Sequence, residues 1–68
     1  MLEDLIRAGD RLVEVTTDDY YSTYRVESVG SRVVLRHEGT GFVTEADPTW
    51  ISRELAAGRL IVLRGDRA

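Results

Sequence analysis

The most informative segment, DPTWISRELAAGRLIVL, contains the signals for a short helix, a helix stop and a buried strand. Asp47 is a favourable N-cap residue, and Pro48 suits the first helical position, where the N–H that proline lacks would have no partner. Gly58 permits the left-handed conformation that ends many helices. The sequence therefore predicts a helix over Pro48–Ala57 and a strand over Leu60–Leu63.

Length and composition restrict the class of protein. The 68 residues suffice for one domain, residues 1–68, near the lower size limit for a single core. No cysteine and one histidine are present, so disulfides and a Cys/His zinc site within one chain are excluded, and no metal or cofactor is predicted. No apolar run approaches membrane-spanning length, and the first residues carry acids where a signal peptide carries bases, which predicts a cytoplasmic protein without membrane contact.

All nine cationic residues are arginine, and the net charge is −3. The absence of lysine is typical of coding bias in a GC-rich genome, and the acidic balance is mildly typical of a halophile with a high-salt cytoplasm. Non-specific nucleic-acid binding needs a basic field, so the net charge argues against it.

The region before the helix predicts strands. Leu2, Leu5 and Ile6 recur at helical spacing, which predicts one or two turns of amphipathic helix that dock on the rest of the chain. A first strand follows over Arg11–Thr16, with Val13 and Val15 on one face and Leu12 out of step with them. The polar residues 17–19 are expected to form a loop.

Two turns set the register of the next strands. A two-residue turn at Gly30-Ser31 follows a strand over Tyr20–Val29 and pairs Val26 with Leu35, Arg25 with Arg36 and Tyr24 with His37. A second turn at Gly39-Thr40 leads to a strand over 41–46. The two turns agree on one inward-facing set, and a three-residue loop at either turn would invert the faces. The first turn gives five members of the set and the second adds the last two: Tyr24, Val26, Val33, Leu35, His37, Phe42 and Thr44.

Four strands, a short helix and a fifth strand is the order found in SH3-like barrels. The patterns GDRL at 9–12, YRVESV at 24–29, RVVL at 32–35 and TG at 40–41 resemble small uncharacterised proteins of that kind. The resemblance implies a mainly β, five-stranded SH3-like barrel with a short N-terminal helix and a helix before the last strand, and it transfers no functional residue. The helices exceed a minimal barrel, which leaves an α+β two-layer sandwich open.

The predicted core contains Val26, Leu35, Ile51, Leu55 and Leu60. The last strand, LIVL, is apolar on both faces, and we expect the N-terminal helix to cover its outer face. His37, on the inner face beside Tyr24, is expected to be a core or rim histidine.

The pairing of Arg25 with Arg36 on the outer face places like charges opposite each other, which destabilises a sheet. Two interpretations follow. Glu27 and Glu38 neutralise the arginines locally, or the pair, with Arg32 nearby, binds a carboxylate or phosphate of a partner.

No serine lies near a suitable base, so the sequence gives no support for serine catalysis. The leading hypothesis is a non-enzymatic module that binds a protein partner. The alternatives are nucleic-acid binding, with arginines on phosphates and Tyr21 stacking on a base, and a self-associating structural subunit that uses LIVL and the N-terminal helix. Trp50 is expected either in the core or at the interface. The candidate partner-binding residues are Tyr21, Arg25, Arg32, Arg36, Val43 and Trp50.

Overall fold

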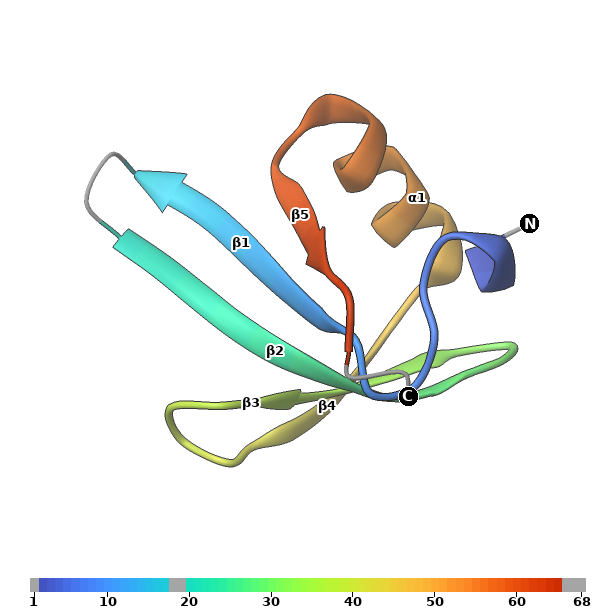
Figure 1. The fold of residues 1–68 in the computed structure, drawn as a ribbon, viewed down its shortest axis with the longest axis horizontal. Coiled ribbons are helices and arrows are strands. Elements are labelled where there is room, and N and C mark those ends of the chain that lie inside the picture. The colour runs from blue at the N-terminus through green and yellow to red at the C-terminus, as the bar shows by residue number, and fades with distance from the viewer. Residues whose placement is uncertain (1, 18–19, 66–68) are drawn as a thin grey trace.

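The computed structural model describes residues 2–17 and 20–65 and shows a mainly β fold (Figure 1). The described residues form one antiparallel five-stranded sheet in the order β4-β3-β2-β1-β5. In chain order the elements are a 3-10 turn η1 (Leu2–Asp4), β1 (Arg11–Thr17), β2 (Tyr20–Val29), β3 (Val33–His37), β4 (Val43–Ala46), α1 (Pro48–Ala57) and β5 (Leu60–Leu63). Of the predicted loop at 17–19, Thr17 ends β1 and the other two residues lie outside the described residues.

Helix α1 has the predicted bounds and caps. Asp47 is extended, and its side chain accepts a hydrogen bond of 2.7 Å from the backbone N–H of Thr49. Gly58 ends the helix at φ 80°, and its N–H donates to the carbonyls of Glu54 and Leu55. Local side-chain and backbone chemistry therefore suffices to fix both ends of this helix.

The β2–β3 hairpin confirms three of the predicted pairs and corrects the turn. Val29 pairs with Val33, so three residues separate the strands instead of two. A bulge between Val26 and Ser28 then absorbs the extra residue. Beyond the bulge, Val26 pairs with Leu35, and the two remaining pairs are also those predicted, Arg25 with Arg36 and Tyr24 with His37.

The β3–β4 pairing is also as predicted, since Leu35 pairs with Thr44. The N–H of His37 donates to the carbonyl of Phe42 at 2.7 Å. The Phe42 side chain, however, is 76% exposed. Phe42 therefore lies beyond the part of the hairpin that the core covers.

The predicted facing of β1 is wrong. Leu12 is fully buried, whereas Val13 and Val15 lie on the other face and are only half-buried. Their partners show this facing, because Leu12 pairs with inward-facing Tyr24 and Val13 pairs with Thr23. Glu14 follows Leu12 on the inner face, so this face of β1 has a single core residue.

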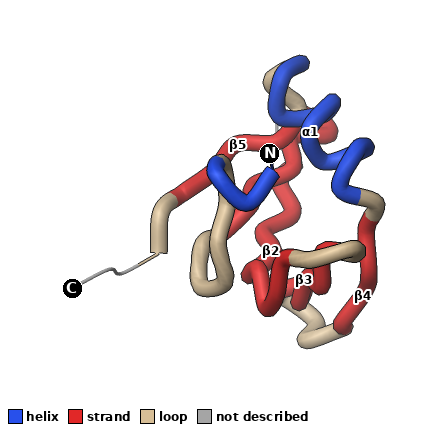
Figure 2. The backbone as a smooth tube through the Cα atoms, turned by 90° about the vertical axis from the view of Figure 1, so that its right-hand side faces the viewer, coloured by secondary structure: helices blue, strands red, loops and turns tan. Residues whose placement is uncertain are grey.

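One hydrophobic core lies between the inner face of the sheet and α1. The predicted core set is confirmed, with Leu55 half-buried at its edge. The N-terminal turn docks on the same chain, as expected, and contributes Leu2 and Ile6. Figures 1 and 2 show this turn and α1 on the same side of the sheet. The expected cover on the outer face of β5 is therefore wrong, and Ile61 and Leu63 are 47% and 43% exposed.

The sheet is not closed into a barrel. Strands β4 and β5 are its two edges, and in the described part of the chain they do not pair with each other. The mainly β prediction is confirmed, and the SH3-like barrel is not.

A buried carboxylate, that of Asp10, links the chain segments before β1 and after β5. The Asp10 side chain is fully buried and accepts the N–H of Arg7 at 2.9 Å and the N–H of Gly65 at 2.8 Å. The guanidinium of Arg64 lies 3.6 Å from the same carboxylate. We call this group of contacts the Asp10 clasp. It ties the segment before β1 to the segment after β5.

Candidate functional site

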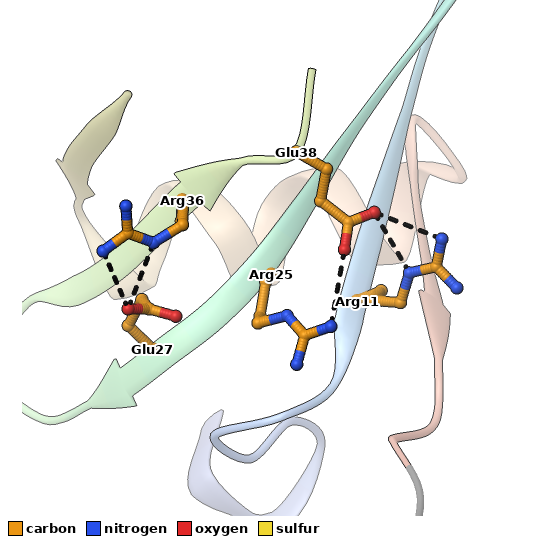
Figure 3. Close-up of polar contacts among 5 residues, drawn as sticks. All are labelled: Arg11, Arg25, Glu27, Arg36 and Glu38. Atoms are coloured by element: carbon orange, nitrogen blue, oxygen red, sulfur yellow. Dashed lines mark hydrogen bonds and ion pairs between the residues drawn. The ribbon is translucent and has the colours of Figure 1, made fainter. Parts of the chain in front are cut away.

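Three arginines lie side by side on the outer face of the sheet, the face opposite α1 (Figure 3). Arg11 of β1 pairs with Arg25 of β2, and Arg25 pairs with Arg36 of β3. Neighbouring strands are about 4.8 Å apart, so the three side chains form one line across the strands. We call this line the arginine row. Its side chains are about half exposed, at 47%, 52% and 47%.

Two glutamates accompany the arginine row (Figure 3). Glu27 lies 3.4 Å from Nε and from Nη2 of Arg36. Glu38 accepts from Arg11 at 3.1 and 3.2 Å, and its other oxygen lies 3.8 Å from Arg25. The local neutralisation considered from the sequence is thus present, but three cations face two anions.

Arg25 has the weakest of these contacts. Its contact of 3.8 Å with Glu38 is too long for a hydrogen bond, and Arg11 holds the same carboxylate at closer range. Exposed ion pairs of this kind contribute about 0 to 1 kcal/mol each. Neither glutamate is therefore held strongly, and the positive charge in the middle of the row is free to attract a further anion.

Exposed apolar side chains border the arginine row on both sides. Ile61 pairs with Val13, and Leu63 pairs with Arg11, which places them on the outer face beside the row. Tyr21 lies further along β2 on the same face and is 60% exposed. We call Val13, Tyr21, Ile61 and Leu63 the apolar flank. Val43, 51% exposed, borders the other end of the row.

The structure thus brings together four of the six predicted residues, Tyr21, Arg25, Arg36 and Val43. Arg32 is not among them, because it lies at the β2–β3 turn, 3.8 Å from Glu45 and 3.9 Å from Asp47. Trp50 is also excluded, because it lies in the first turn of α1 on the inner side of the sheet.

Sequence reasoning missed Arg11, and it left Ile61 and Leu63 out of the candidate partner-binding residues. Arg11 joins the row only because a register shift between Val15 and Thr17 moves the β1–β2 pairing by one residue. No turn residue signals that shift, so counting outward from the loop would have paired Arg11 with the wrong residue. Ile61 and Leu63 enter the sequence analysis only as part of LIVL, which was expected to be covered by the N-terminal helix or to serve self-association.

A cleft of about 350 Å³ opens on the inner face. Buried Leu12, Leu35 and Leu60 border it, and Trp50, 39% exposed, stands at its side. An open hollow of about 370 Å³ adjoins it over His37 and Phe42. The remaining residues around the cleft are Glu14, Tyr24, Thr44, Glu45, Ala46 and Asp47.

Hydrogen bonds lower the pKa of two carboxyl groups on or near α1. The backbone N–H of Thr49 lowers the pKa of Asp47 below its ordinary value of 3.8. A hydrogen bond from Arg59 lowers the pKa of Glu54 below 4.5, and the same pair raises the pKa of Arg59. Both carboxyl groups are therefore ionised at neutral pH.

His37 lies at the rim of the inner face, as predicted. Its ring meets that of Tyr24 edge to face, with centroids 5.2 Å apart. Its Nδ1 accepts the backbone N–H of Thr40 at 3.1 Å. This geometry assigns His37 to packing and to holding the β3–β4 turn.

Residues 2–17 and 20–65 contain no group of three or more side chains placed to hold a metal ion. Within the same residues, no helix has the length and apolar character needed to cross a membrane.

No family model matches the chain, and searches of curated proteins and of solved structures gave no significant match. The SH3-like resemblance therefore stays a prediction.

Proposed function

We propose that this chain is a small non-enzymatic binding module, and that a protein partner docks an acidic segment on the outer face of its sheet. The observation that carries this proposal is the arginine row, which lies between the apolar flank and Val43. Interfaces combine a desolvated apolar centre with a few oriented charged groups, and arginine and tyrosine are enriched in them. The outer face offers both kinds of group on one rigid sheet.

The apolar flank would supply affinity. Tyr21, Ile61 and Leu63 each expose between 43% and 60% of their surface. Fully burying a side chain of this size contributes about 1.5 to 3 kcal/mol, so covering the exposed half gives on the order of 1 kcal/mol each. Several such contacts suffice for a weak complex, and the arginines would then orient the partner.

The charge of the row favours a carboxylate as the partner group. Within the described residues the ion pair of Arg25 is its long contact with Glu38, and a guanidinium binds a carboxylate with two parallel hydrogen bonds. A nucleic-acid backbone is less favourable, because Glu27 and Glu38 lie within the row and the chain carries a net charge of −3. A second copy of the same face is also less favourable, because both halves of a symmetric contact would carry the same row of three arginines and two glutamates, and so the same positive charge.

The test compares a double variant with a matched control. R25Q/R36Q removes two charges from the row without placing new negative charges beside Glu27 and Glu38. R7Q/R53Q makes the same change of net charge with exposed arginines that lie outside the outer face. Both variants are expected to keep the native circular dichroism spectrum, because exposed substitutions usually change stability little.

The probes are labelled peptides that are acidic, neutral or basic, each with one leucine and one tyrosine, together with single-stranded and duplex oligonucleotides. We expect the natural protein and R7Q/R53Q to prefer the acidic peptides, and R25Q/R36Q to bind them at least tenfold more weakly, the effect of about 1.4 kcal/mol. Equal binding by both variants, or a preference for oligonucleotides, would contradict the proposal.

A further inference from the structure

The cleft on the inner face is separate from the surface proposed above. The arginine row points away from α1, whereas Trp50 in the first turn of α1 borders the cleft. Its volume of about 350 Å³ is at the lower end of the range for small-molecule sites, about 300 to 1,000 Å³. A ligand of this site is therefore a small compound, about the size of one aromatic ring with a short chain.

The walls of the cleft favour an apolar body. Leu12, Leu35 and Leu60 are 0%, 5% and 4% exposed, so they form a fixed floor below the cleft and present little surface to a ligand. Trp50 and Tyr24 add aromatic surface. An aromatic or aliphatic group in the cleft would be covered by preformed apolar walls, with little further ordering of side chains.

The charged groups of the cleft favour a cation. Glu45 lies two residues from outward-facing Val43 on β4, so the strand register directs its side chain to the outer face. Among the described residues, the charged ones that line the cleft are all acidic, and these are Glu14, Glu45 and Asp47. The last two also face Arg32, at distances of 3.8 and 3.9 Å that indicate weak, exposed pairs.

Glu14 is placed differently from the other two carboxylates. It lies on the inner face of β1, two residues after buried Leu12, and is half-buried. Its contact in the cleft is a long hydrogen bond of 3.4 Å from the hydroxyl of Tyr24. Among the described residues no arginine or histidine forms an ion pair with Glu14.

We propose that the cleft binds a small organic cation, with an ammonium group directed to Glu14 and an apolar body between Trp50 and the leucine side chains. The aromatic faces of Trp50 and Tyr24 would add cation–π attraction to the pairing with the carboxylate. The charge complementarity of the cleft thus selects both the sign and the shape of the ligand.

Three probes of similar shape test this assignment: 2-phenylethylammonium, 2-phenylethanol and 3-phenylpropionate. Trp50 is the single tryptophan of the chain and borders the cleft, so its fluorescence reports binding directly. A ligand of this size is expected to bind with a Kd of about 1 mM. We expect the alcohol to bind about tenfold more weakly than the ammonium, and the carboxylate not to bind measurably.

Variants separate the charge from the apolar contact. E14Q keeps an oxygen that can accept from Tyr24 and removes the charge, so it should weaken ammonium binding about tenfold and leave alcohol binding unchanged. E27Q makes the same change on the outer face and should have no effect. W50L, followed by ligand-observed NMR, should weaken both probes.

Three outcomes would each overturn the assignment. They are equal binding of the three probes, ammonium binding that E14Q does not change, and no fluorescence change with any probe. R25Q/R36Q should leave ammonium binding unchanged, which keeps this result independent of the function proposed for the outer face. A lysine-containing peptide that binds the cleft more tightly than the free ammonium would also overturn it, because the site would then be a peptide site.

Discussion

Replacing Asp10 with alanine is expected to lower the free energy of unfolding by about 3 kcal/mol. The carboxylate accepts two backbone N–H groups, at 2.9 and 2.8 Å, and its side chain is fully buried. A hydrogen bond to a charged group contributes about 1.5 to 3 kcal/mol, and part of the sum is regained because the variant no longer buries a charge. Arg64 adds little, since its guanidinium is 58% exposed and would be rehydrated.

The size of this loss is large for such a chain. At about 0.05 to 0.15 kcal/mol per residue, 68 residues give a total stability of roughly 3 to 10 kcal/mol. A loss of about 3 kcal/mol would lower the melting temperature by roughly 12 to 24 °C. Urea and thermal unfolding, followed by the fluorescence of Trp50, would measure the change.

Two further variants identify the contacts responsible. D10N keeps one acceptor oxygen but turns an NH2 group toward the other N–H, so its loss should be intermediate. R64A should cost about 1 kcal/mol or less, as expected for an exposed ion pair. If D10A loses less than R64A, or if D10N is as destabilised as D10A, the two backbone hydrogen bonds are not what holds the clasp.

The remaining predictions concern the core, the C-terminal cap of α1 and the loss of stability at acidic pH. L35A should cost about 2 to 5 kcal/mol, because Leu35 is 5% exposed in the single core, and an unchanged urea midpoint would contradict that packing. G58A should cost about 1 kcal/mol in the same assay, since φ is 80° there and alanine is strained in that region; equal stability would show that the helix end rearranges. The lowered pKa values of Asp47 and Glu54 stabilise the fold above their ordinary values of 3.8 and 4.5, and this contribution is lost as pH falls. D47N/E54Q should therefore show a flatter decline of the urea midpoint between about pH 5 and about pH 3, and parallel curves would assign the acid limb to other carboxylates.

The parts of the fold that depend on neighbouring residues could be predicted from the sequence. The bounds of α1 follow from Asp47, Pro48 and Gly58, each of which acts on its own backbone or on residues within one turn. The prediction of the inward-facing residues of β2 and β3 is also confirmed, because apolar alternation at Val33 and Leu35 fixes the face independently of the turn.

The parts that depend on distant contacts could not be predicted. In β1 the alternation of two valines predicted the wrong inward face. Leu12 is the residue that the core covers, and Glu14, the next residue on that face, borders the cleft. The arginine row was predicted only for Arg25 and Arg36. Its third member, Arg11, depends on a register shift that leaves no sequence signal.

The bulge at Glu27 also bears on which turn this hairpin can form. The third residue of the loop between Val29 and Val33 is offset by one unpaired residue in β2, so the core-facing pairs beyond the bulge are those of a two-residue turn. The two forms have the same chain length, and both keep Val26 opposite Leu35. A substitution that favours the two-residue turn would therefore change the pairing only between the bulge and the turn, and it would leave the core-facing pairs in place.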